Sequence, residues 1–328
     1  MASISIIIPA YNEAGAVGAT VRKVQEVFQD SGHTFEVLVV DDGSRDATGP
    51  EAEFAGARVV RHPVNLGYGY ALMSGISRAR YPLIGITDAD GTYPIEELPA
   101  MTEEVAKRGL DMLVGARRGA QYQGSPAKRI ARWFFKFLAE FACGRTIPDI
   151  NSGLRVMRRD MLVQFAGVLC GGFSFTTTIT IIAILTGRFV DYRPIAYAQR
   201  IGKSHVRYFR DTLRAMQIIV MTIILFNPMK FFLLFALGVG AAGLPLVLLA
   251  ALVPRTSGWV LILTLFILGM SLLGSIGFLA EQRRAIFVGP RQHRARTPRK
   301  GRKVRAHSSG GASGPGEVKS PHFPVKPR

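Results

Sequence analysis

Apolar and polar positions alternate along the first two hundred residues in a pattern typical of strands followed by helices. Val17, Val21, Val24 and Phe28 recur at the spacing of one helix face, after a candidate cap at Asn12. The apolar runs that predict strands cover 3–8, 35–40, 58–60, 83–87 and 112–114. Strands that alternate with helices predict an α/β fold with a mostly parallel sheet, which binds ligands at the carboxyl ends of its strands.

Two longer apolar runs follow in the second half of the chain. Residues 231–253 and 258–280 contain no charged side chain. At a rise of about 1.5 Å per residue, each run can cross a hydrocarbon layer about 30 Å thick, and soluble helices normally keep a polar face. We therefore predict two transmembrane helices within 229–281, preceded by juxtamembrane amphipathic helices over 206–228. The run 173–185 is shorter and rich in Thr, so we place it inside the preceding domain.

The positive charge is concentrated at the end of the chain. Residues 282–328 hold thirteen basic residues and one acid, a net +12 out of the chain's +18. The positive-inside rule predicts a cell-membrane protein with two spans, whose N-terminal domain and basic, disordered tail are both cytoplasmic. Nucleic acid is the alternative binding partner that such a basic chain suggests. However, no base-stacking aromatics are interleaved with the tail, so we predict anionic lipid and no nucleic acid.

The strongest chemical signal is the pair Asp88 and Asp90, where the apolar run 83–87 ends. Two carboxylates at this spacing suit a hard dication such as Mg²⁺ or Mn²⁺, which can neutralise a departing diphosphate. An isolated Asp-x-Asp is usually a solvated turn, so the prediction depends on its neighbours. The two apolar runs nearby indicate a lipid acceptor.

Five motifs in order give the chain a family resemblance. They cover residues 6–13, 39–44, 65–67, 87–94 and 151–155. Together they resemble glycosyltransferase family 2, and more narrowly its polyprenyl-phosphate branch, which includes the dolichyl-phosphate mannose synthases. The resemblance covers roughly residues 3–210. It implies a GT-A fold over 1–205 and inverting transfer of a sugar from GDP-mannose or a UDP-hexose to undecaprenyl or dolichyl phosphate.

The resemblance also implies a set of site residues. Asp88 and Asp90 would hold the metal, and one of Asp41 and Asp42 would accept a hydrogen bond from the nucleobase or ribose. His205 stands where the family usually has Lys, and Gly91-Thr92 replace the Leu-Gln of many mannose synthases. The implied donor-binding residues are Pro9, Tyr11, Glu13, Val40, Asp41, Asp42, Asp88, Ala89, Asp90, Arg117, Arg200, Lys203 and His205.

Catalysis at a phosphate acceptor needs cations more than a base. A phosphate monoester has a second pKa near 6, so its attacking oxygen is already largely ionised at neutral pH. We predict that Arg117, Arg129 and Arg132 bind the acceptor phosphate and, with Asp90, form the catalytic set. The segment 128–136 mixes cations with aromatics, as a helix at the membrane surface does.

Two other functions remain open. A processive polysaccharide synthase would need a Gln-x-x-Arg-Trp motif and more spans, whereas Arg129 stands here in the Gln position before Arg132-Trp133. The second alternative is a non-catalytic scaffold that binds sugar nucleotides at the membrane, although such a scaffold would not need both Asp88 and Asp90. The sugar, the nucleobase and the oligomeric state, including a homo-oligomer, stay open.

Overall fold

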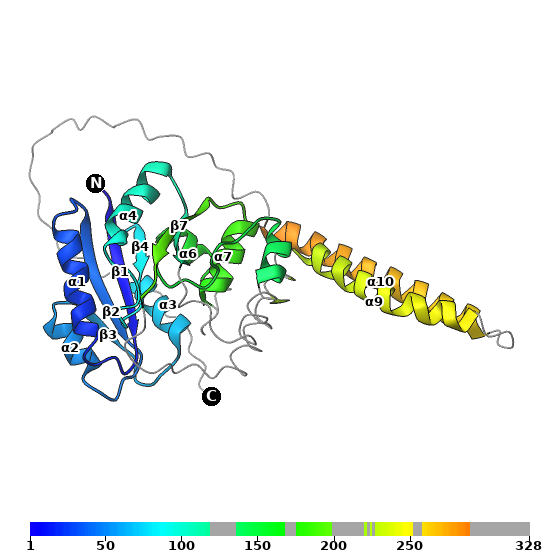
Figure 1. The fold of residues 1–328 in the computed structure, drawn as a ribbon, viewed down its shortest axis with the longest axis horizontal. Coiled ribbons are helices and arrows are strands. Elements are labelled where there is room, and N and C mark those ends of the chain that lie inside the picture. Colours follow the sequence, from blue (N-terminus) through cyan, green and yellow to red (C-terminus); the bar gives the residue numbers. More distant parts are fainter. Residues whose placement is uncertain are drawn as a thin grey trace, which may run out of the picture. The chain divides into compact units, whose positions relative to one another are not determined.

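The first two hundred residues build a seven-stranded sheet. The computed structural model describes residues 1–118, 136–167, 175–198, 220–221, 224, 227–251 and 258–288. The strand order is β3-β2-β1-β4-β6-β5-β7, and Figure 1 labels β1 to β4 and β7. The strands are β1 (Ser3–Ala10), β2 (Thr34–Asp41), β3 (Arg58–Arg61), β4 (Leu83–Ile86), β5 (Met112–Arg118), β6 (Arg155–Arg158) and β7 (Val190–Ala196). All five strands expected from the sequence are confirmed.

The sheet is mostly parallel, as expected, but β6 runs against its neighbours. It pairs antiparallel with β4 and with β5, whereas the other pairings are parallel. Arg155 lies opposite Ile86, so β6 begins at the edge of the sheet where β4 ends. The sequence did not predict β6 or β7. Two arginines end β6, and Arg155 is fully buried.

Helices cover both faces of the sheet. The helices α1 (Val17–Gln29), α2 (Thr48–Phe54) and α4 (Glu97–Arg108) pack on one face, where Ile4, Ile6 and Ile8 of β1 point. The opposite face is covered by α3 (Tyr68–Arg78), α6 (Arg159–Gln164) and α7 (Phe175–Leu185), together with Ile7. Because strand side chains alternate between faces, β1 is apolar on both sides and lies in the middle of the core. The placement of α7 inside this domain is confirmed.

The predicted cap of α1 is wrong. The helix begins at Val17 with Ala16 as its N-cap. Asn12 instead adopts a left-handed backbone, with φ of 53°, and its Oδ1 accepts a hydrogen bond from the Arg45 amide at 2.9 Å. The side chain that was expected to cap the helix therefore holds the loop after β2.

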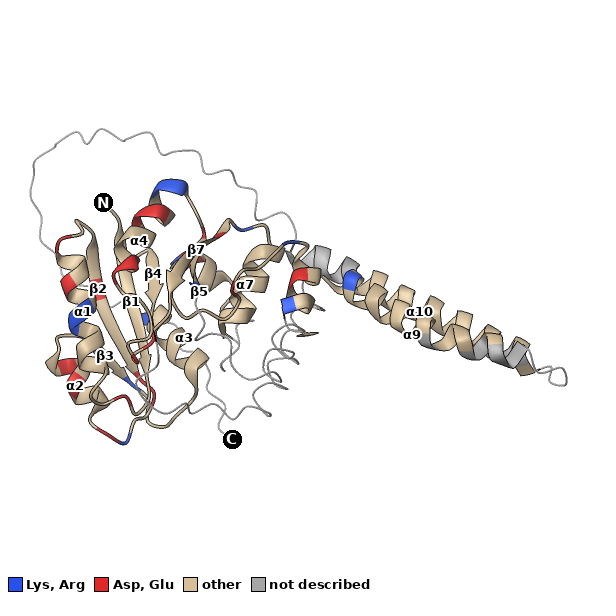
Figure 2. Cartoon of the chain, viewed as in Figure 1, with Lys and Arg blue, Asp and Glu red and all other residues tan. Residues whose placement is uncertain are grey.

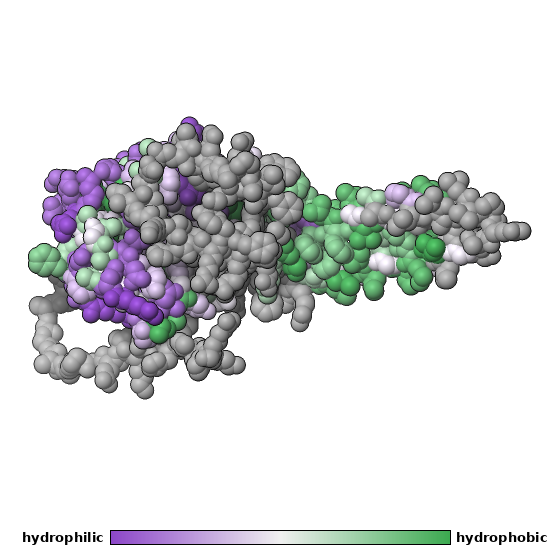
Figure 3. Space-filling view, turned by 60° about the horizontal axis from the view of Figure 1, so that its bottom comes forward, coloured by the Kyte–Doolittle hydropathy of each residue, from purple (hydrophilic) through white to green (hydrophobic). Residues whose placement is uncertain are grey.

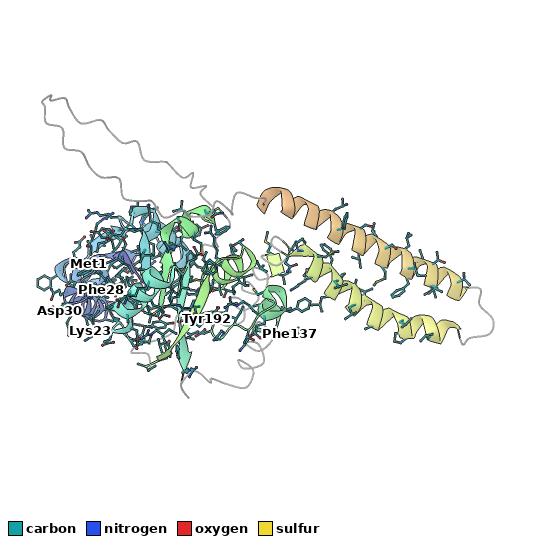
Figure 4. The ribbon with its side chains drawn as sticks, turned by 90° about the horizontal axis from the view of Figure 1, so that it is seen from above. Met1, Lys23, Phe28, Asp30, Phe137 and Tyr192 are labelled. Atoms are coloured by element: carbon teal, nitrogen blue, oxygen red, sulfur yellow. The ribbon has the colours of Figure 1, made fainter. Side chains whose placement is uncertain are left out.

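The last described part is a pair of long apolar helices, α9 (Pro228–Ala251) and α10 (Gly258–Val288), which lie side by side in Figures 1 and 4. Both are long and apolar enough to cross a membrane. Figure 2 shows little charge along them, and Figure 3 shows a hydrophobic surface. Phe266 and Phe232 pack against glycines of the partner helix, at Gly243 and Gly277. Helix α10 runs on to Val288, so the start of the predicted tail is helical.

Other segments predicted from the sequence cannot be compared. The interfacial helix over 128–136 and the juxtamembrane helices over 206–228 lie almost wholly outside the described residues, and so does the tail from 289 onward.

Replacing Gly43 with Ala is expected to destabilise the domain by about 3 kcal/mol, because strain and a backbone overlap add together. Gly43 has φ of 74°, and a Cβ would lie 2.5 Å from the backbone carbon of Val64. Thermal unfolding of the full chain in detergent measures the effect. Gly32→Ala is the matched control, since Gly32 has φ of 68° and nothing within 4 Å. Equal losses for the two variants would contradict the overlap.

Candidate active site

The sheet topology brings three predicted motifs to one edge. The ends of β1 and β2 lie side by side, with Ala10 opposite Asp41, and β4 pairs with β1 on its other side. Asp41 ends β2, and the loops that follow these strands carry Tyr11 to Glu13, Asp42 and Asp88 to Asp90. Pro9 and Val40 lie opposite each other in the last paired rows and are buried. Their contacts with a donor remain predictions.

The acidic turn after β4 is held from several sides. The Tyr68 hydroxyl donates to Asp88 Oδ1 at 3.2 Å, and Thr20 on α1 donates to the carbonyl of Ala89 at 2.9 Å. Gly153 faces Asp88 so closely that a Cβ there would lie 3.0 Å from Oδ2. A side chain at this position would crowd the carboxylate, so the glycine allows the β6 loop to pack closely against the acidic turn.

Two tyrosines beside this turn act as hydrogen-bonding groups and not as anions. Burial, with a further contribution from the charge of Asp88, raises the pKa of Tyr68 and of Tyr93. Tyr93 accepts a hydrogen bond from the Gly153 amide at 2.7 Å. Both hydroxyls keep their protons at neutral pH, so neither adds negative charge next to Asp88 and Asp90.

The ligand set fits Mg²⁺ or Mn²⁺. Among the described residues no group of three or more His, Cys, Asp or Glu could hold a metal ion. Mg²⁺ is commonly bound by one or two carboxylates together with substrate phosphates and water. Asp88 and Asp90 could supply those carboxylates, and a diphosphate would complete the coordination.

The backbone donors before α1 are already used by the protein. In dinucleotide-binding folds the amides at such a helix start bind the diphosphate. Here the four amides of residues 12–15 donate to Ser44 Oγ, Thr48 Oγ1, Asp46 Oδ2 and Glu51 Oε2, at 2.6 to 3.2 Å. The protein's own side chains, two of them carboxylates, fill this position. A diphosphate at this edge therefore needs another positive partner, such as a cation on the acidic turn.

Asp42 organises the loop that follows β3. The Asp42 side chain is 5% exposed, and its carboxylate accepts from His62 Nδ1 at 2.6 Å and from the amides of Leu66 and Gly67 at 3.0 and 2.8 Å. His62 Nε2 in turn contacts Ser74 Oγ at 2.8 Å. The sequence did not indicate His62, because no motif links it to Asp42. Direct contact of Asp42 with a donor remains a prediction, as it does for Asp41, whose Oδ1 accepts from the Ser44 amide.

Arg117 at the end of β5 is paired with a carboxylate that the sequence did not predict. Its Nε and Nη2 donate to the two oxygens of Asp149 at 2.7 and 3.0 Å, and its guanidinium lies 5.4 Å from the centre of the Tyr197 ring. The Arg117 side chain is 12% exposed. Burial favours the neutral acid, but the hydrogen bonds and charge of Arg117 hold the pKa of Asp149 below its ordinary value. Binding of donor or acceptor by Arg117 remains a prediction.

Asp149→Asn is expected to lower the free energy of unfolding by about 3 kcal/mol at pH 7, since it leaves a buried arginine without its counter-charge. The folded pKa of Asp149 lies below the unfolded value of about 3.9, so the carboxylate stabilises the fold above that pH. The difference between wild type and variant should shrink as the pH falls below about 4. Urea unfolding at pH 7 and pH 3.5 measures it, with exposed Asp30→Asn as control. A difference of equal size at both pH values would contradict the assignment.

Arg155 is a buried cation that ties the β6 loop together. Its side chain is fully buried and donates to the carbonyls of Ser152 and Ile150 at 2.7 and 2.8 Å, and to Thr180 Oγ1 at 2.7 Å. These bonds hold the loop that presents Gly153 to Asp88. The motif 151–155 marked this loop in the sequence without indicating what Arg155 does.

Five of the predicted site residues lie outside the described part of the chain. They are Arg129, Arg132, Arg200, Lys203 and His205. The last three follow Ala198, which is the last described residue after β7.

Comparisons with known proteins point to one family. Residues 5–165 match the family model of glycosyl transferase family 2. The chain is 31% identical to a dodecaprenyl-phosphate galacturonate synthase of Rhizobium johnstonii, over 49% of each chain, and thus spans about half the length of that relative. It is also 31% identical to an undecaprenyl-phosphate 4-deoxy-4-formamido-L-arabinose transferase of Pseudomonas fluorescens, over 76% of this chain and 72% of the relative.

The fold is also found among solved structures. Glucosyl-3-phosphoglycerate synthase of Mycobacterium tuberculosis, in complex with Mn²⁺, UDP and phosphoglyceric acid, superposes with a TM-score of 0.57. The match covers 68% of this chain and 78% of that one at 17% identity, which shows a common fold. Taken with the ordered motifs at one edge of a mixed sheet, these similarities show that the chain belongs to glycosyl transferase family 2.

Proposed function

We propose that this protein is a membrane-anchored, inverting glycosyltransferase that moves a sugar from a nucleotide sugar to a polyprenyl phosphate. The acidic turn Asp88 to Asp90 carries the proposal, because it follows a central strand and packs against a glycine. The backbone amides before α1 already donate to the protein's own side chains, so they are not available to bind the diphosphate in its place. The names of both relatives include a polyprenyl phosphate, which supports the same class of acceptor here.

The donor would sit across the carboxyl ends of β1, β2 and β4. Its nucleoside would lie near Pro9, Tyr11 and Asp41, and its diphosphate near the acidic turn. A bound Mg²⁺ or Mn²⁺ would supply positive charge to the departing diphosphate. The related fold that holds Mn²⁺ and UDP supports this chemistry. Whether the donor is GDP-mannose or a UDP-hexose stays open.

The acceptor would need alignment more than activation. Its phosphate is already ionised near neutral pH, so the enzyme has no need to remove a proton. Arg117, Arg129 and Arg132 would reduce the repulsion between two anionic substrates. Arg117 already pairs with Asp149, so it would position the phosphate with its remaining N–H donors and would add little net positive charge.

The two apolar helices would keep the active site beside a lipid surface. A polyprenyl tail would remain in the bilayer while its phosphate reached the edge of the sheet. The basic tail favours a cytoplasmic position for the catalytic domain and both chain ends. This side of the membrane is also where nucleotide sugars would reach the site.

The test is a donor screen on the purified full chain in detergent. Labelled GDP-mannose, UDP-glucose, UDP-galactose and UDP-glucuronate are each incubated with undecaprenyl phosphate and Mn²⁺, and parallel samples lack the lipid. The expected product is extractable into organic solvent, labile to mild acid and absent without the lipid. Label found only in long polymer would overturn the proposal in favour of a polysaccharide synthase. Binding of a nucleotide sugar with no transfer would favour a scaffold.

A further inference from the structure

Thr92 lies two residues beyond Asp90 and bonds it twice. Its amide donates to Asp90 Oδ1 at 3.1 Å, and its hydroxyl donates to the same oxygen at 2.7 Å. Thr92 is 1% exposed and Asp90 is 6% exposed. Hydrogen bonds to an ionised acceptor are among the stronger ones in proteins, so this pair fixes the orientation of the carboxylate.

The turn that carries Thr92 is itself fastened to other elements. The carbonyl of Thr92 accepts from the amide of Ala198 at 3.0 Å, just after β7. The next residue, Tyr93, packs its ring edge-on against Tyr197, with 5.2 Å between ring centres, and accepts from the Gly153 amide. The turn that carries the Thr92 hydroxyl is therefore fastened to the segment just after β7 and to the β6 loop. Without these contacts, a short turn next to Gly91, which has φ of 70°, would leave the Thr92 hydroxyl more conformational freedom.

We propose that Thr92 is a positioning residue that sets the Asp90 carboxylate for the divalent cation. The proposal rests on the proposed function, since it needs a cation at the acidic turn. Groups that hydrogen-bond a ligating carboxylate orient it, and their loss typically lowers metal affinity about 10- to 100-fold. The Thr92 hydroxyl orients the carboxylate, and the Thr92 main-chain amide contributes the second hydrogen bond.

The experiment compares Thr92→Val with Thr92→Ser in the full chain. Valine matches threonine in shape but lacks the hydroxyl, whereas serine keeps it. Mn²⁺ affinity is measured from the electron paramagnetic resonance signal of free Mn²⁺, in the presence of UDP or GDP according to the donor screen. We expect valine to weaken Mn²⁺ binding about 10-fold, near the low end of the range because the amide bond remains. Serine should bind within about 3-fold of wild type, because it keeps the hydroxyl bond to Asp90.

Thr102→Val is the matched control. Thr102 is also fully buried, and its hydroxyl donates to the carbonyl of Leu98 at 2.7 Å within α4. This variant loses a comparable hydrogen bond and should bind Mn²⁺ as wild type does. Melting temperatures without metal confirm that all variants are folded. If Thr102→Val weakened Mn²⁺ binding as much as Thr92→Val, a general loss of packing would replace the proposal.

Two further results separate this proposal from the proposed function. Wild-type affinity in Thr92→Val, or a loss in Thr92→Ser as large as in Thr92→Val, would overturn the role of the hydroxyl and leave the metal at Asp90 intact. No Mn²⁺ binding by the wild type in the presence of its nucleotide would overturn both. Transfer measured over a range of Mn²⁺ concentrations should show the same shift, with activity of Thr92→Val recovering at high Mn²⁺.

Discussion

Asp90→Asn is expected to lower the rate of sugar transfer by at least about 10³-fold, which corresponds to about 4 kcal/mol of transition-state stabilisation. Asparagine keeps the size of aspartate and can still accept from Thr92, but it removes one negative charge from the cation site. A weaker cation site would leave the departing diphosphate less neutralised. Initial rates of lipid-linked product formation, at saturating donor and over a range of Mn²⁺ concentrations, measure the effect.

The control for this variant is Asp30→Asn. Asp30 is exposed at the end of α1, close to Met1 and Phe28 and away from Tyr192 in Figure 4. Helix α1 leads away from the carboxyl ends of the strands, so Asp30 lies at the other edge of the sheet. It should transfer sugar at the wild-type rate. An Asp90→Asn variant that keeps full turnover and full Mn²⁺ dependence would contradict the metal site.

The sequence predicted β1 to β5 and missed β6 and β7, although β3 and β6 both place two apolar residues between arginines. The run Ile6-Ile7-Ile8 identifies β1 because both faces of a central strand are covered by helices. The sequence did not indicate β6 as a strand because Arg155 is buried inside it, which is an exception to the rule that arginine stays at the surface. Bonds to backbone carbonyls and to Thr180 make this burial tolerable, and such tertiary contacts leave no local pattern.

The grouping of the candidate-site loops was predictable from the sheet topology, whereas the side-chain pairs around them were not. The motifs with Asp41-Asp42 and Asp88-Asp90 follow strands, so a parallel sheet brings them to one edge. Asp149 lies 32 residues from Arg117, and His62 lies 20 from Asp42, in segments whose packing no short-range signal describes. Asn12 is a further example of a contact that the local sequence does not reveal, since the side chain expected to cap α1 accepts a hydrogen bond from Arg45 in a distant loop.

Asp42→Ala is expected to lower the free energy of unfolding by about 3 kcal/mol, because it leaves two backbone amides and the ring of His62 without their buried acceptor. For a domain of this size the melting temperature should fall by about 6 to 12 °C. Thermal unfolding followed by circular dichroism measures the change. The loop 65–67 would lose its anchor, so the KM for the nucleotide sugar should rise as well.

A double-mutant cycle separates the part that His62 contributes. Because Asp42 still accepts from the amides of Leu66 and Gly67 when His62 is lost, His62→Ala alone should cost less than Asp42→Ala. The combined variant should lose less stability than the sum of the two, with a coupling of about 1 to 2 kcal/mol. Asp30→Ala, which removes an exposed carboxylate, should change stability by no more than about 0.5 kcal/mol. Additive losses would mean that Asp42 acts through the amides of Leu66 and Gly67 alone, and a stable Asp42→Ala variant would contradict its role in holding this loop.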